Sequence, residues 1–160
     1  MEKLLLFVLM AVVWLTAQVQ QIDEEMAMKA LFEGKHAVNR AAHAAAQQLD
    51  GQRLAYGEVH IDPGEAMVSA KQYLRANLQL DGMLNPTADS LFRDRVDIAL
   101  FEVINEDHTF PYTYRNAAYN YEVTLERPGV IMIIRLQYPR AFNVLQPIEW
   151  YVKGAAELVY

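Results

Sequence analysis

The sequence predicts an α+β fold, in which a long N-terminal helix and a second, short helix pack on a mostly antiparallel sheet of four or five strands. Residues 18–49 contain no proline, a single glycine and many good helix formers. Roughly the last 70 residues alternate apolar and polar side chains with a period of two, as half-buried strands do. No repeat or low-complexity linker divides the 160 residues, so we expect residues 22–160 to form one domain.

Composition and charge argue against several classes of function for this protein. The formal net charge is −6, from 20 acidic and 14 basic residues, and no run of Lys and Arg occurs. This balance argues against nucleic acid as the main partner. The chain has no cysteine, which excludes disulfides, thiolate zinc sites and cysteine nucleophiles. No phosphate-binding loop occurs and the four histidines lack metal-ligand spacing, so we expect no cofactor and no metal.

The first 21 residues are expected to act as a membrane anchor or a signal segment. Residues 4–17 are apolar apart from Thr16, and carry no charge. In one interpretation the helix is an uncleaved anchor that continues past residue 17. In another it is a secretory signal with a cleavage site after Ala17, and in a third it is a buried helix of a soluble protein. The side chains expected to face lipid or neighbouring subunits are Leu4, Leu5, Leu6, Phe7, Val8, Leu9, Val12, Val13, Trp14, Leu15, Val19 and Ile22.

The flanking charges indicate an orientation. Lys3 precedes the apolar run, whereas Asp23, Glu24 and Glu25 follow it. A basic flank favours the cytoplasmic side. We therefore expect a single-pass protein of the cell membrane with its C-terminal domain outside the cytoplasm, or a secreted protein if the segment is cleaved.

The helix is expected to continue to residue 49, where Asp50 and Gly51 would end it. Apolar residues recur at helical spacing in its second half, at Met28, Leu31, Val38, Ala42, Ala45 and Leu49. The alanine tract at residues 41–46 makes the helix thin, which permits close approach to a sheet or to another helix. This continuity favours the anchor, because a cleaved signal would gain nothing from it.

A short strand and a second helix are expected next. Val59 and Ile61 alternate within residues 53–62, which predicts a strand. Asp62 and Pro63 then form a typical helix start. The helix is expected to end near residue 80, and a short helical turn should follow at residues 88–92. Its predicted apolar stripe is Ala66, Val68, Ala70, Tyr73, Leu74 and Leu78.

The remaining sequence predicts the sheet. Residues 95–105 form one strand, and residues 119–126 and 130–138 form a hairpin around Pro128 and Gly129. The segment 130–138 is apolar on both faces at its start and should be central or covered by helix. The last strand alternates Ile148, Trp150 and Val152 with polar residues, and we expect Trp150 to be buried against the long helix.

Few residues suggest catalysis, and the chain is not expected to be an enzyme. His36 and His43 lie too far apart on one helix to share a metal ion. The pair His60 and Asp62, and the loop residues 106–108, are most simply surface polar groups. The Tyr-rich segment 112–121, with Tyr112, Tyr114 and Arg115, could bind a glycan or a peptide by stacking, but such tyrosines also pack in cores.

The layout of an apolar helix that runs into an alanine-rich amphipathic helix and an α+β domain resembles that of pilin-like subunits. The stretch HAVNRAAHAAA at residues 36–46, and the end of the chain at residues 150–160, resemble TadE/TadG-like proteins of tight-adherence pili. No glycine-type prepilin cleavage site precedes the apolar run. The resemblance implies a minor pilin or pseudopilin of a pilus or secretion system, whose partners are the membrane, other pilin-like subunits or secretion-platform proteins. No small-molecule substrate is expected. A secreted or tethered binding module that uses residues 112–121 is the alternative.

Overall fold

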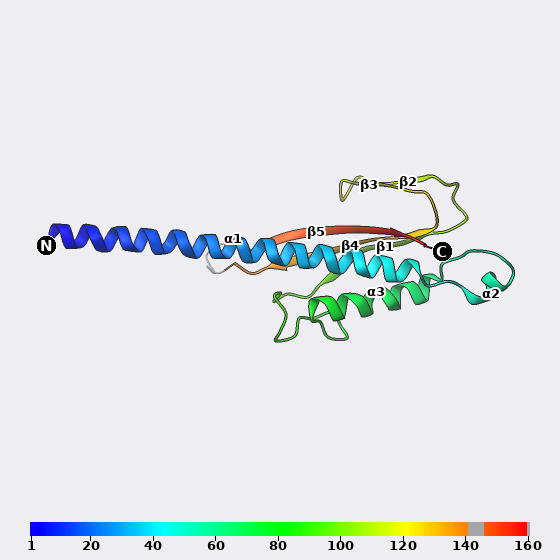
Figure 1. Ribbon diagram of the computed structural model, residues 1–160, viewed down its shortest axis with the longest axis horizontal. Coiled ribbons are helices and arrows are strands. Elements are labelled where there is room, and N and C mark those ends of the chain that lie inside the picture. The colour runs from blue at the N-terminus through cyan, green and yellow to red at the C-terminus, as the bar shows by residue number, and fades with distance from the viewer. Residues whose placement is uncertain (141–145, 160) are drawn as a thin grey trace.

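The computed structural model describes residues 1–140 and 146–159 and confirms the α+β fold. Helix α1 (Glu2–Ala46) forms the long axis of the molecule, and its N-terminal part extends beyond the other elements (Figure 1). The packed part of the chain, which we call the head, begins at Asp23, the first buried residue. The other elements are α2 (Gly51–Ala55), α3 (Pro63–Leu78), β1 (Asp97–Ile104), β2 (Tyr112–Asn116), β3 (Tyr121–Leu125), β4 (Gly129–Tyr138) and β5 (Ile148–Glu157).

The strands form two sheets rather than one. An antiparallel three-stranded sheet has the order β1-β4-β5, and β2 and β3 form a two-stranded sheet. The predicted central position of residues 130–138 is confirmed. The predicted hairpin with residues 119–126 is wrong, because β1 and β5 occupy both edges of β4. Strand β3 pairs with β2 instead, from Tyr112 opposite Leu125 to Asn116 opposite Tyr121.

Strand β4 is buried on both faces because separate layers cover them. Alternate residues from Val130 to Tyr138 join the main core with α1 and α3. Ile131 faces the other way and packs with Ile104, Tyr114 and Leu125 in a second, smaller core under the β2–β3 hairpin. Helix α3 lies beside α1, on the opposite side of the sheet from the hairpin (Figure 1).

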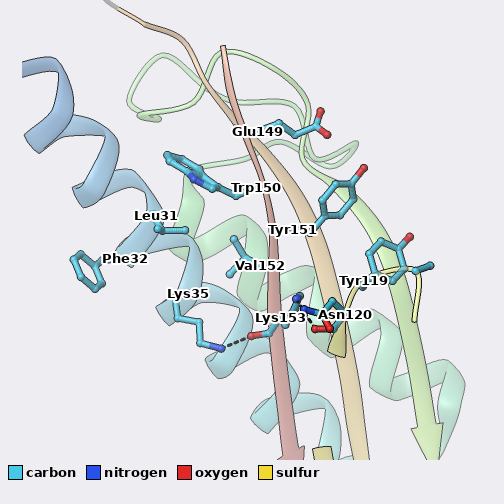
Figure 2. A pocket seen from close by; sticks show the side chains of 11 residues that line it. Leu31, Phe32, Lys35, Tyr119, Asn120, Glu149, Trp150, Tyr151, Val152 and Lys153 are labelled. Carbon is cyan, nitrogen blue, oxygen red and sulfur yellow. Dashed lines mark hydrogen bonds between the residues drawn. The ribbon is translucent and has the colours of Figure 1, made fainter. Parts of the chain in front are cut away.

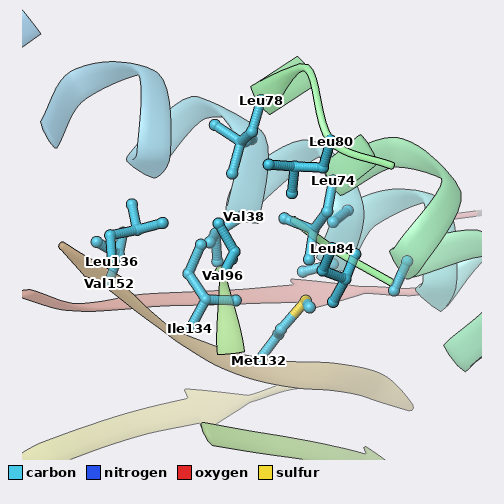
Figure 3. Packing of buried hydrophobic residues seen from close by; sticks show 14 of the residues in the cluster. Val38, Leu74, Leu78, Leu80, Leu84, Val96, Met132, Ile134, Leu136 and Val152 are labelled. Atoms are coloured by element: carbon cyan, nitrogen blue, oxygen red, sulfur yellow. The ribbon is translucent and has the colours of Figure 1, made fainter. Parts of the chain in front are cut away.

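The main core is made of aliphatic side chains from both helices and the sheet. Figure 3 shows the cluster, with α1 and α3 above the strands. Its labelled members include Val38, Leu74, Leu78, Val96, Met132, Ile134, Leu136 and Val152. All are nearly inaccessible to solvent. This layer fixes the direction of α1 relative to the sheet.

The chain between α1 and α3 differs from the prediction. Helix α1 ends at Ala46, not at residue 49. Asp50 starts a helix instead of ending one, because its Oδ1 accepts hydrogen bonds from the N–H groups of Gln52 at 2.8 Å and Arg53 at 3.2 Å. The predicted strand at residues 53–62 is wrong. Residues 51–55 are helical, and Ile61 forms only an isolated bridge with Leu49.

The predicted start of α3 is confirmed, but its predicted apolar stripe includes residues that are exposed. Asp62 Oδ1 accepts from the N–H groups of Gly64 at 2.7 Å and Glu65 at 3.0 Å, with Pro63 in the first turn. Val68 and Tyr73 are exposed, whereas the buried residues are Ala66, Ala70, Leu74 and Leu78. The helix ends at Leu78, two residues before the predicted end. Residues 88–92 contain a turn and no helix.

Candidate functional site

The N-terminal part of α1 is an apolar helix that the head does not cover. Every side chain predicted to face lipid or other subunits is exposed, from 40% for Val19 to 71% for Leu5. These residues, from Leu4 to Ile22, lie on all sides of the helix rather than on one stripe. Helix α1 is long and apolar enough to cross a membrane, and no residue of its apolar window is buried within the protein. By composition the same segment also fits a signal sequence.

A buried acid marks the point where α1 enters the head. Asp23 is 4% exposed, and its Oδ2 lies 3.6 Å from Arg140 Nη1. The Tyr138 hydroxyl donates a hydrogen bond to Asp23 Oδ1 at 3.4 Å. Burial raises the pKa of Tyr138, and the neighbouring Asp23 carboxylate raises it further. The sequence placed Asp23 among solvent-facing flanking charges, and its buried contacts come from residues more than a hundred positions away.

Glycines bring α1 very close to the sheet. A Cβ atom at Gly34 would collide with Leu136 and contact Val152, and one at Gly154 would lie 2.5 Å from Val38 Cγ1. The buried surface of α1 is otherwise mostly alanine. Of the predicted stripe, Val38, Ala42 and Ala45 are buried, whereas Met28 is half-exposed. The lone glycine within residues 18–49 was the available sequence signal for this contact.

Beside this contact, a groove of about 650 Å³ runs between α1 and β5. Figure 2 shows Leu31, Phe32 and Lys35 on the helix side, and Tyr119 and Asn120, from the turn between β2 and β3, on the other side. The remaining wall is β5 from residue 149 to 153. We call this feature the α1–β5 groove.

Trp150 lies in this groove and is half-buried. It shares the α1-facing side of β5 with Val152, as predicted, but it is not enclosed between sheet and helix. Its ring centroid is 6.3 Å from that of Tyr138. The expectation of full burial is wrong because the α1 residue opposite Trp150 is Leu31, which leaves part of the indole open (Figure 2).

The α1–β5 groove carries positive charge at one end. Lys35 Nζ donates to the backbone carbonyl of Lys153, and Lys153 Nζ donates to the carbonyl of Asn120 at 3.1 Å. Neither ammonium forms an ion pair with any residue in 1–140 or 146–159. Burial lowers the pKa of Lys35, and the charge of Lys153 lowers it further. Glu149, the acid that lines the groove, accepts from Arg135 and Gln137.

The predicted ligand surface at Tyr112, Tyr114 and Arg115 is not one continuous patch. Tyr114 is 7% exposed, because it packs under the hairpin against Leu125 and Ile131, and this burial raises its pKa. Tyr112 is half-buried, with its ring 4.4 Å from that of His108. Arg115 is exposed, and its Nε lies 3.0 Å from Glu122 Oε2. Tyr114 therefore packs in a core, which is the alternative that the sequence left open. Tyr119, later in the same segment, lines the α1–β5 groove.

His60 has an acidic neighbour, although not the expected one. Its Nδ1 lies 2.8 Å from Glu106 Oε1, which also accepts from Arg53 at 2.8 Å. Burial raises the pKa of Glu106, but hydrogen bonds from its backbone and from His60, together with the charge of Arg53, lower it more, so the net shift is downward. Asn105 is buried and bonds both backbone groups of Ile61. These contacts attach the segment before α3 to the end of β1.

In the loop 106–108, His108 lies beside an acid without a hydrogen bond to it. Its Nδ1 is 3.1 Å from Asp107 Oδ1, but this buried nitrogen has no hydrogen-bond partner among the described residues. Elsewhere, Asp97 accepts from Arg135 at 3.0 Å. In the part of the chain that the structure describes, no group of three or more His, Asp or Glu residues is arranged to hold a metal ion. Tyr160, at the end of the pilin-like stretch, lies outside the described residues. No family model, curated protein or solved structure matches this chain.

Proposed function

We propose that the protein is a membrane-anchored, extracytoplasmic structural or assembly component, similar in layout to a minor pilin or pseudopilin of a pilus or secretion system. The proposal rests on one observation, namely that the two halves of α1 have different surroundings. A single helix of 45 residues has an uncovered apolar first half and a second half that packs in the head.

The length of the uncovered part fits a bilayer. Residues 2–21 of a straight helix span about 30 Å at 1.5 Å per residue, which equals the hydrocarbon thickness of a typical membrane. In water, so many exposed Leu, Val and Phe side chains would be unfavourable by about 25 cal/mol per Å² of apolar surface. Lipid, or the apolar helices of neighbouring subunits, would remove this surface from water.

The helix continues without a break beyond the proposed membrane boundary. The acidic residues Glu24 and Glu25 are exposed there, while Lys3 lies at the opposite end of the apolar segment. This arrangement supports an N-terminus in the cytoplasm and a head outside it. Met28 and Phe32 are at least half-exposed above the acidic residues. These side chains provide an apolar surface for another subunit or for a secretion-platform protein.

The test places a charge in the uncovered helix. Val19→Asp or Ile22→Lys should abolish membrane retention or assembly while the head stays folded, because neither side chain contacts the head core. The matched controls Val19→Leu and Ile22→Leu should behave as the wild type. Retention is measured by carbonate extraction of membranes, assembly by chemical cross-linking, and folding by protease resistance of the head. His60→Ala and His108→Ala should leave function intact, and loss of function in these variants alone would favour an enzyme or ligand site instead.

The α1–β5 groove favours a second candidate function, a tethered binding module. Its half-buried tryptophan is a feature of recognition surfaces. Its two lysines have no acidic partner among residues 1–140 and 146–159, so they are available to a negatively charged ligand. This function is compatible with an anchor, because the groove lies in the head.

A further inference from the structure

The free edge of β5 faces the α1–β5 groove. Strand β5 is at one end of the β1-β4-β5 sheet, and within the described residues no strand pairs with its outer side. The direction of its backbone groups follows from the register. Leu158 N–H donates to the carbonyl of Pro128 at 2.8 Å, and the register that places Gly129 opposite Glu157 also places these residues opposite each other.

Backbone groups in an antiparallel ladder alternate in direction from residue to residue. Even-numbered residues of β5 therefore bond to β4, and the odd-numbered residues Glu149, Tyr151 and Lys153 direct N–H and C=O toward the groove. The hydrogen bond from Lys35 Nζ to the Lys153 carbonyl agrees with this assignment. Within residues 1–140 and 146–159, the N–H groups of Tyr151 and Lys153 have no acceptor on the groove side.

Open strand edges of this length are normally blocked, since they are templates for pairing with another chain. Here Lys35 covers only the Lys153 carbonyl, the edge is open at Tyr151 and at the Lys153 N–H within the described residues, and it has a wall on each side. Leu31 and Phe32 of α1 border one face of the edge, and Tyr119 with Asn120 borders the other (Figure 2). An extended chain that pairs with β5 would point alternate side chains toward these two walls.

The charged and apolar residues of the groove indicate which side chains a bound extended chain would carry. Lys35 and Lys153 repel each other and have backbone carbonyls as their hydrogen-bond acceptors. Glu149, at the other end of this stretch of β5, is paired with Arg135 at 3.4 Å, an arginine that it shares with Asp97. A carboxylate placed between the lysines would be attracted to both, while an apolar side chain would contact Trp150 and Leu31.

We propose that the open edge of β5 binds an extended acidic peptide segment of a partner protein by strand addition, with its backbone paired to Tyr151 and Lys153, a carboxylate at Lys35 and Lys153, and an apolar residue against Trp150. Strand addition is an established mode of peptide recognition, in which backbone hydrogen bonds give affinity and side-chain pockets give specificity. The inference does not require the anchor, because the groove is formed entirely by the head.

The test uses the full chain in detergent micelles and a labelled, end-blocked heptapeptide of alternating valine and glutamate. Fluorescence anisotropy should show saturable binding with a Kd below about 1 mM, the weak end of measurable affinities. The same peptide with lysine in place of glutamate should bind at least about tenfold more weakly, and the double variant Lys35→Glu/Lys153→Glu should reverse this preference. Absence of saturable binding, or equal binding of both peptides, would overturn the proposal.

A matched pair of variants tests the backbone pairing. Tyr151→Pro removes an N–H that faces the groove and leaves the β4 ladder intact, whereas Tyr151→Ala keeps that N–H. The proline variant should bind at least about tenfold more weakly than the alanine variant, and a fully N-methylated peptide should not bind. Equal binding by both variants, or binding of the N-methylated peptide, would show that the groove recognises charge alone, as an anionic saccharide would require. Failure of both peptides to bind, together with concentration-dependent self-association that is lost in Lys35→Glu/Lys153→Glu and in Tyr151→Pro, would overturn the proposal and identify a second copy as the occupant. Because the assay needs no membrane, failure of this test is distinguishable from failure of the anchor.

Discussion

Replacement of Gly154 by alanine tests the close contact between α1 and β5. The added Cβ would lie 2.5 Å from Val38 Cγ1, 3.1 Å from Asn39 Oδ1 and 3.4 Å from the backbone carbon of Val38. Val38 is fully buried, and a β-branched side chain has little rotamer freedom in a helix. The helix must therefore move away from the sheet, or the new methyl group must stay compressed.

Two opposing effects determine how much Gly154→Ala changes the free energy of unfolding. Overpacking of a close-packed core destabilises by about 1–3 kcal/mol. Alanine in place of glycine stabilises by about 0.4–1 kcal/mol, because it reduces the freedom of the unfolded chain. We expect the net free energy of unfolding to fall by about 1–2 kcal/mol. Gly82→Ala is the matched control, since a Cβ at Gly82 meets no atom within 4 Å. It should leave stability unchanged or slightly increased.

Val38→Ala should partly rescue the Gly154→Ala protein. On its own it should cost about 2 kcal/mol for the lost methyl groups and the cavity. In combination it removes the closest contact, so the double variant should be more stable than additivity predicts by about 1 kcal/mol. Urea unfolding of the full chain in micelles, followed by Trp150 fluorescence in a Trp14→Phe background, measures each term. Strict additivity, or a stability gain in Gly154→Ala, would refute the close-contact argument.

Three further predictions concern the polar contacts of the head. Asp62→Ala removes the cap of α3 and should lower the free energy of unfolding by about 1 kcal/mol in urea, whereas Asp62→Asn should retain most of it. Asn105→Ala leaves the buried backbone N–H and carbonyl of Ile61 unpaired. It should cost about 1–3 kcal/mol in the same assay. A smaller loss than that of Asn77→Ala, at a half-buried asparagine of α3, would contradict this role. The lowered pKa of Glu106 means that its stabilising contribution is present above the unfolded-state pKa and is lost as the pH falls through the folded-state value. The free energy of unfolding, measured from pH 7 to pH 3, should therefore fall less steeply in Glu106→Gln than in the wild type. The same pH dependence in both proteins would show that Glu106 is uncoupled from folding.

Elements specified by neighbouring residues were predictable from the sequence. The long helix, the cap at Asp62 followed by Pro63, and the central strand at residues 130–138 were found because each depends on local composition or period. The same local rules gave a wrong result at Asp50 and Gly51, since an acid followed by glycine suits both the end of one helix and the start of the next. The bonds from Gln52 and Arg53 to Asp50 decide between these outcomes.

Features that depend on distant residues were not predictable. The alternation at Tyr121–Leu125 shows a strand but carries no information about its partner, which is β2 rather than β4. The α1–β5 groove joins Lys35 to Lys153, across most of the chain, and its shape depends on the half-buried position of Trp150. Likewise Asp23 is buried because Tyr138 and Arg140 reach it. The exposed apolar segment of α1 was the part of the candidate site that composition alone could identify.

We propose above all that residues 4–17 stay attached and hold the protein in a membrane or in a helix-packed assembly. The most direct measurement is N-terminal sequencing, with intact mass, of the protein recovered from carbonate-washed membranes and from the medium. We predict a membrane-associated chain that retains residues 4–17. A mature chain that starts at Gln18 and is found in the soluble fraction would contradict the account, because the apolar half of α1 would then be a signal that is removed.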